Sequence, residues 1–392
     1  MPRSLSSLWL KNLRRLGKAQ QAQGRRLFKS LLPPAVRAPA ARRPSSAKVL
    51  KPVKVRKARA ARPVQRPASP SLIPAAVPGV WRKTWFSWPG ASQVASARRM
   101  LYWLYLPSGA AHALATPLPL VVMLHGCQQT ASDFATATRM NALAERKGFA
   151  VLYPQQSAAA DAHRCWHWYK RATQQGQGDV RLVADMIAHV QQRYSLDTTR
   201  TYMAGLSAGA ALANLVALRH PGLIAAVGLH SAPVFGTTDS AMSAYRAMQH
   251  GSGAHHSDSA QAFADTQPLL ASKAGMPVIL IHGDQDKVVR RINAQQLMQQ
   301  FRIINAAAIT RAEPVQRRFP ARPSGRLRPA YQTATYYAGR KPQLVLCEVD
   351  TLGHAWSGGD ASVAFSAAEG PDATLMMWSF FARHRRQPMP SA

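Results

Sequence analysis

The chain has 392 residues, 47% of them hydrophobic, which is enough for one sizeable core. The formal net charge of +33 is uneven, because residues 1–132 hold 23 of the 50 Lys and Arg residues and no Asp or Glu. Three cysteines are too few for a disulfide scaffold. The sequence contains no run of 18 apolar residues, so it predicts no transmembrane helix. The composition therefore indicates a globular domain with a strongly basic N-terminal part.

Residues 1–84 are predicted to form a basic tail. Residues 3–30 place Leu5, Trp9 and Leu16 at helical spacing among cations. This pattern suits either an amphipathic helix on an anionic surface or a solvated, half-formed helix, and it favours neither. Because Lys and Arg interrupt every apolar run near the N-terminus, we expect no secretory leader and a cytoplasmic location.

Residues 33–80 are rich in Pro, Ala, Arg, Lys and Ser. Proline and like charge oppose packing, so we expect a disordered linker. Its cations could hold nucleic acid through the phosphates, but no aromatic residues are interleaved for base stacking. The tail is therefore a candidate anchor for a polyanion or for another anionic or amphiphilic surface.

Residues 85–392 alternate between apolar runs and helical patterns. We expect strands at 100–107, 118–125, 149–153, just before 205, and at 224–231, 277–282 and 343–349. Helices are expected at 133–147, 180–194, after 207 and at 372–384. This alternation predicts an α/β fold with a mostly parallel sheet. Residues 305–341 form a basic insertion without clear periodicity, which we expect to be an exposed excursion.

Gly205-Leu206-Ser207-Ala208-Gly209 fits the pattern G-x-S-x-G between a predicted strand and a small-residue helix. A serine on such a sharp turn needs neighbours without bulk, and the turn exposes its hydroxyl above the sheet. The motif therefore predicts that Ser207 is a nucleophile. The alternative is a structural Gly-Ser turn, because the bare pattern also occurs in unrelated proteins.

A serine nucleophile needs a base, and the base needs an orienting carboxylate. Asp286 and His354 each follow a predicted strand downstream of Ser207, in the order Ser, acid, His. Asp284 competes for the role of the acid, but Asp286 lies just before a Val pair that can anchor the loop. The other histidines that end apolar strands are expected to be structural, namely His125, His230 and His282.

The tetrahedral intermediate of acyl transfer needs amide donors. The amide of Ala208 directly follows the nucleophile. We assign the second donor to the amide of Cys127, in the loop after the strand at 118–125. The Cys127 thiol is not expected to be a nucleophile, since no second His/Asp set is left for it.

The sequence resembles the esterase family of poly(3-hydroxybutyrate) depolymerases, and in particular its type 1 catalytic domain. The resemblance covers about residues 90–385. It is carried by His125-Gly126-Cys127-x-Gln129, Cys165-Trp166-x-Trp168-Tyr169, the Ser207 motif, Gly353-His354-Ala355-Trp356-Ser357-Gly358-Gly359 and Gly370-Pro371-Asp372-Ala373. It implies an α/β-hydrolase that cleaves 3-hydroxyalkanoate esters with Ser207, Asp286 and His354. We expect no metal and no cofactor.

The same motifs suggest further roles for aromatic and sulfur-containing residues. Trp166, Trp168 and Trp356 are candidates for an apolar groove that grips a polyester, although core packing is the alternative. Cys127 and Cys165 lie in loops that should meet near the site, as a disulfide or as the free thiols that a reducing cytoplasm favours. Cys347 is expected to be a small buried residue.

Some features depart from the family pattern. Secreted members resemble this core but begin with a signal peptide and carry a further substrate-binding domain. The basic tail instead suggests an enzyme acting on oligomers or stored polymer granules, and His167 stands where the family more often has Asn. Two alternatives stay open: a feruloyl or acetylxylan esterase, and a granule- or polyanion-binding protein with a hydrolase scaffold.

Overall fold

The computed structural model describes residues 77–88, 99–111, 117–236, 238–252, 275–323 and 328–386. The amphipathic helix expected at 3–30 and nearly all of the linker at 33–80 lie outside these residues. The first strand, β1 (Val80–Ser87), begins before the domain boundary that the sequence predicted at residue 85. None of the helices in the described part is long and apolar enough to span a membrane.

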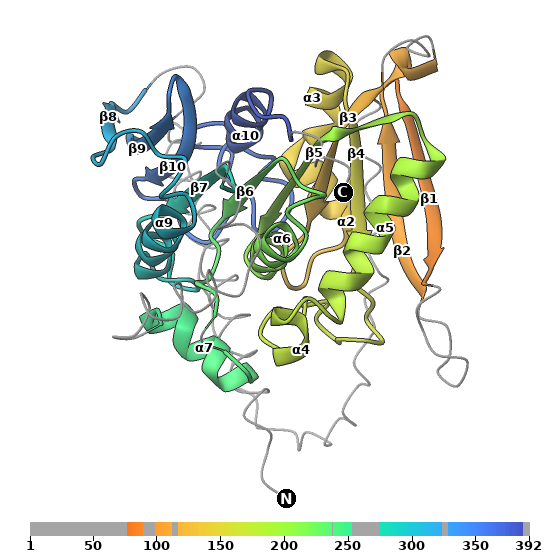
Figure 1. The fold of residues 1–392 in the computed structure, drawn as a ribbon, viewed down its shortest axis with the longest axis horizontal. Coiled ribbons are helices and arrows are strands. Elements are labelled where there is room, and N and C mark those ends of the chain that lie inside the picture. The colour runs from red at the N-terminus through yellow and green to blue at the C-terminus, as the bar shows by residue number, and fades with distance from the viewer. Residues whose placement is uncertain are drawn as a thin grey trace, which may run out of the picture. The chain divides into compact units, whose positions relative to one another are not determined.

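The described part contains a ten-stranded sheet with the order β1-β2-β4-β3-β5-β6-β7-β10-β9-β8 (Figure 1). The six inner strands from β4 to β10 run parallel to one another. The two strands at each edge, β1 and β2 on one side and β9 and β8 on the other, are joined by antiparallel pairing. The inner strands are β4 (Ala150–Gln155), β3 (Leu118–Leu124), β5 (Leu196–Leu206), β6 (Ala226–His230), β7 (Val278–Gly283) and β10 (Lys341–Val349). The apolar sequences of β3, β6 and β7 suit strands that are buried on both faces.

Helices cover both faces of this sheet (Figure 1). One core cluster packs the sheet against α5 (Asp179–Arg193), α6 (Ala208–Arg219) and α9 (Ile292–Ile304). The other packs it against α2 (Ala131–Thr138), α3 (Met140–Lys147) and α10 (Ala373–Phe381). Further elements are β2 (Arg99–Leu106), η1 (Ser108–Ala111), α4 (Arg171–Gln174) and α7 (Ala241–His250). The arrangement confirms the predicted α/β-hydrolase architecture.

The helix that the sequence predicted at 133–147 is two helices in the structure. Arg139 adopts a left-handed conformation, with φ 53° and ψ 27°, and ends α2 before α3 begins. A capping box between Thr130 and Asp133 starts α2. The break is not visible in the sequence, because no glycine or proline marks it.

The segment at 305–341, expected to be an exposed excursion without periodicity, contains two strands in the structure, although many of its described residues are exposed. β8 (Val315–Phe319) and β9 (Tyr331–Ala338) extend the sheet beyond β10 as antiparallel strands. β9 contains three Tyr and two Thr residues, and Tyr336 joins the core. Such residues favour strands, and β10 offers them an edge for pairing.

Candidate active site

The parallel strands bring the candidate residues to the same end of the sheet, at the carboxyl ends of the strands. Leu124 of β3 pairs with Gly205 of β5, and Leu206 of β5 pairs with His230 of β6. The loops that follow these strands therefore begin side by side. At the next strand pair, Val349 of β10 pairs with Gly283 of β7, so the loops of His354 and Asp286 also start as neighbours. This is the end of an open α/β sheet at which ligands bind in general.

Ser207 lies between β5 and α6 with φ 56° and ψ −121°, an unfavourable conformation for a residue with a side chain. Both glycines of the motif are needed by close packing. A Cβ atom on Gly209 would lie 2.1 Å from the carbonyl oxygen of Leu124, and one on Gly205 would lie 2.5 Å from the backbone carbon of Gly209. The Ser207 amide donates to the carbonyl oxygen of His230 at 3.0 Å. The elbow is thus held by backbone contacts on two sides.

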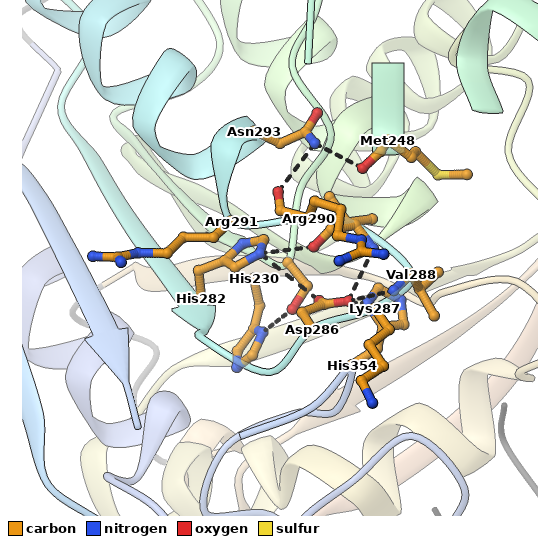
Figure 2. A network of polar contacts seen from close by, with 12 residues as sticks. His230, Met248, His282, Asp286, Lys287, Val288, Arg290, Arg291, Asn293 and His354 are labelled. Carbon is orange, nitrogen blue, oxygen red and sulfur yellow. Dashed lines mark hydrogen bonds and ion pairs between the residues drawn. The ribbon is translucent and has the colours of Figure 1, made fainter. Parts of the chain in front are cut away.

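Asp286 and His354 form a buried pair (Figure 2). Nδ1 of His354 lies 2.7 Å from Oδ2 of Asp286, while Oδ1 of Asp286 accepts from the amides of Val288 and Val289 at 2.9 Å. Burial by itself raises the pKa of Asp286, but the charge and hydrogen bond of His354, with smaller contributions from His282 and the Val289 amide, hold it at about 2. The competing Asp284 is exposed. The structure therefore brings Asp286 to the histidine, and the Val pair anchors its loop.

The three histidines expected to be structural are buried and hydrogen-bonded. Nε2 of His282 lies 2.9 Å from the carbonyl oxygen of Val289 and 3.9 Å from Oδ2 of Asp286 (Figure 2). Nε2 of His125 accepts from the amide of Gln156 at 3.1 Å. Burial lowers the pKa of His125 to about 4 and that of His230 to about 3. Burial also lowers the pKa of His282, so all three rings favour the neutral form.

The loop after β3 lies against the serine elbow. A Cβ atom on Gly126 would stand 3.7 Å from Cβ of Ser207. Two hydrogen bonds connect Gly126 and Gln129 within this loop. The backbone amide of Gly126 donates to Oε1 of Gln129 at 2.9 Å, and the backbone amide of Gln129 donates to the carbonyl oxygen of Gly126 at 3.3 Å. The Gln128 amide donates outward to the carbonyl of His163 at 2.6 Å. The backbone amide of Cys127 lies between these hydrogen-bonded neighbours, and the backbone amide of Ala208 lies in the first turn of α6, directly after Ser207.

Cys127 and Cys165 form a disulfide, which corrects the preference for free thiols. The bond joins the loop after β3 to the loop that carries Trp166. The preference was wrong because it rested on the expected compartment and not on geometry. Cys347 is buried in β10, as expected, and burial raises the pKa of its thiol.

The three tryptophans do not line a groove. Trp166 and Trp356 are 0% exposed and Trp168 is 4% exposed. The Trp166 indole donates to the carbonyl of His125 at 3.0 Å, and the Trp356 indole donates to Oγ1 of Thr374 at 3.1 Å. An indole whose N–H group is hydrogen-bonded can bury its large apolar surface. These tryptophans therefore pack in the interior below the loops of the candidate site. The alternative of core packing is the one that the structure favours.

The structure also places residues that sequence reasoning left without a role. His167 lies between two carboxylates, with Nδ1 3.5 Å from Oδ2 of Asp179 and Nε2 3.8 Å from Oδ2 of Asp161. Five non-glycine residues in the loops around the candidate site have positive φ: Gln128, Arg164, Ser207, Ser231 and Phe365. Apart from the elbow motif at Ser207, no sequence signal marks them, because such strain is imposed by the surrounding structure.

A doubly covered parallel sheet with a strained serine between a strand and the next helix defines the α/β-hydrolase fold. A solved structure, the acetyl xylan esterase from Aspergillus awamori, superimposes with a TM-score of 0.55 at 20% identity. The match covers 70% of this chain and 94% of that one. Residues 100–318 match the family model described as Esterase PHB depolymerase. The chain therefore belongs to this family.

Two curated relatives match parts of the chain. Poly(3-hydroxyalkanoate) depolymerase C of Paucimonas lemoignei is 29% identical over 199 residues, covering 50% of this chain and 46% of the relative. Probable acetylxylan esterase A of Aspergillus fumigatus is 33% identical over 133 residues, covering 33% of this chain and 34% of the relative. The chain thus spans less than half the length of each of these relatives.

Proposed function

We propose that this protein is a carboxylic ester hydrolase in which Ser207, His354 and Asp286 carry out acyl transfer. The observation that carries the proposal is the buried Asp286–His354 hydrogen bond, in loops that start from the same sheet edge as the strained Ser207 elbow. A carboxylate on Nδ1 leaves Nε2 of the imidazole as the atom that exchanges protons with a serine hydroxyl. Membership of the Esterase PHB depolymerase family supports this assignment.

In the proposed mechanism, Oγ of Ser207 attacks the ester carbonyl while Nε2 of His354 takes the hydroxyl proton. The negative charge on the carbonyl oxygen is stabilised by the amides of Ala208 and Cys127, and each donor contributes about 3 kcal/mol. His354 then protonates the departing alcohol, leaving an acyl-serine. Water, deprotonated by His354, releases the acid and regenerates Ser207.

The substrate class that we propose is the ester bond of 3-hydroxyalkanoate polymers and oligomers. Its support is the family and the name of the relative from Paucimonas lemoignei. An acetylxylan esterase is the second candidate, because a relative of that name is 33% identical and the Aspergillus awamori enzyme shares the fold. The Cys127–Cys165 disulfide favours an oxidising compartment over the cytoplasmic or granule-associated location expected from the sequence.

The test compares hydrolysis of 3-hydroxybutyrate oligomers, acetylated xylan and methyl ferulate by the full chain. We expect turnover of the oligomers that is lost in Ser207→Ala. Ser379→Ala is the matched control, since Ser379 is exposed on α10, and it should retain full activity. Turnover of acetylated xylan or ferulate alone would reject the polyester assignment, and equal rates for Ser207→Ala and the wild type would reject the mechanism.

A further inference from the structure

Phe365 adopts a left-handed backbone conformation with φ 60°. For a bulky aromatic residue this is an unfavourable conformation that persists only where surrounding contacts enforce it. The enforcing contacts are present on both sides of the residue. The carbonyl of Phe365 accepts from the Trp356 amide at 2.8 Å, and the carbonyl of Ala364 accepts from Nε2 of Gln129 at 3.2 Å.

These two contacts place Phe365 between the two halves of the candidate active site. On one side, Trp356 follows His354 by two residues, and the Phe365 ring meets the His354 ring edge-on with centroids 6.5 Å apart. On the other side, the same Gln129 side chain accepts from the amide of Gly126, which lies beside Ser207. The strained residue is therefore tied both to the histidine and to the loop that carries the Cys127 amide.

The ring is only half-buried. It packs against the core cluster that contains Trp356, and part of its surface stays accessible. The three tryptophans that the sequence suggested as substrate contacts are buried, so they offer almost no surface to a ligand. Phe365 is thus a partly exposed aromatic residue whose ring meets the His354 ring edge-on.

We propose that Phe365 is a specificity-determining residue whose ring forms an apolar wall beside His354 and limits the size of the acyl chain of the ester. This inference rests on the proposed function. A wall of this kind favours short acyl chains, because a longer chain would need the space that the ring fills. The backbone strain is then the consequence of holding the ring at this point, since relaxing φ would turn the side chain away from His354.

The experiment measures kcat/KM for p-nitrophenyl butanoate and p-nitrophenyl octanoate with the full chain. We expect the butanoate-to-octanoate ratio to fall about 10-fold in Phe365→Ala and in Phe365→Gly, the range expected for reshaping an apolar pocket. Phe319→Ala is the matched control, because Phe319 is a half-buried phenylalanine stacked on Tyr331 at the sheet edge. Its ratio should equal that of the wild type.

The pair of variants separates specificity from stability. Glycine adopts positive φ without penalty, so Phe365→Gly should unfold at a higher temperature than Phe365→Ala although both lose the ring. Equal loss of selectivity in both variants supports the wall. An unchanged ratio, or a ratio that follows the unfolding temperature, overturns it. Failure of the wild type to hydrolyse either ester, or equal rates in Ser207→Ala, would instead reject the proposed function, and the inference with it.

Discussion

The carbonyl oxygen of His230 accepts a hydrogen bond from the amide of Ser207 at 3.0 Å. The imidazole of the same residue reaches in another direction, because its Nε2 accepts from the amide of Ser357 at 3.1 Å. Ser357 lies three residues after His354. One buried histidine at the end of β6 therefore joins the serine elbow to the loop of the candidate base.

To accept the hydrogen bond from Ser357, the imidazole of His230 must be neutral. Since Nε2 accepts from an N–H group, the proton must lie on Nδ1, which is 3.2 Å from Oγ of Ser231. The ring also stacks on Trp356, with centroids 5.2 Å apart. Burial, followed by the nearby His282 and His354, lowers the pKa of His230 to about 3 from its ordinary 6.5.

The first prediction concerns the dependence of stability on pH. Below pH 6.5 the unfolded chain takes up a proton at His230 while the folded chain does not, so the stabilisation present above pH 6.5 is lost as the pH falls toward 3. In this range His230 contributes a slope of about 1.4 kcal/mol per pH unit to the free energy of unfolding. Urea denaturation between pH 4.5 and 7 measures the slope. His230→Gln should lower the slope by about this amount, while the other buried histidines still contribute to it. An unchanged slope would contradict the assignment.

The second prediction distinguishes the two candidate acids. Asp286→Asn should lower kcat for ester hydrolysis about 10,000-fold, because the amide favours the wrong tautomer of the histidine. Asp284→Asn is the matched control, since Asp284 is exposed two residues away. Its kcat should stay within a factor of about two of the wild type. Steady-state kinetics on a soluble ester decide, and a larger loss in Asp284→Asn would reverse the assignment.

The third prediction concerns the disulfide. Cys127 and Cys165 are separated by 38 residues, and closing a loop of that length restricts the unfolded chain by about 4 kcal/mol. Reduction should therefore lower the midpoint of thermal unfolding and also kcat, because the Cys127 amide loses its anchor. The Cys127→Ser/Cys165→Ser double variant should behave like the reduced protein and should not respond to reductant. Equal midpoints with and without reductant in the wild type would argue against the bond.

The fourth prediction tests packing at the elbow. Gly209→Ala should abolish most activity and destabilise the fold, since the new Cβ would meet the Leu124 carbonyl oxygen at 2.1 Å and neither backbone can yield easily. Gly222→Ala is its control, because a Cβ there would meet nothing within 4 Å. Circular dichroism melts and esterase rates of both variants provide the measurement. A tolerated Gly209→Ala would show that the elbow has room to move.

Several parts of the site could be predicted because they depend on local chemistry. The spacing of Gly205, Ser207 and Gly209 reflects steric limits within a single turn. The positions of Asp286 and His354 after strands follow from the rule that loops meet at the carboxyl ends of parallel strands. The sequence did not predict the break of a helix at Arg139, because no glycine or proline marks it. It also did not predict the strands β8 and β9, because they form by pairing along the edge that β10 offers.

By itself the sequence predicted an α/β fold with a mostly parallel sheet, because periodicity and turn chemistry are short-range properties. It also placed a candidate serine, acid and histidine after strands in that order, and its resemblance to a known esterase family implied the α/β-hydrolase fold. Only the tertiary structure decided which aspartate contacts His354, that Cys127 pairs with Cys165, and that Trp166 and Trp356 face the interior. It alone placed Phe365 beside His354 under backbone strain. These features depend on residues far apart in the chain, whose approach is set by the packing of the whole sheet and its loops.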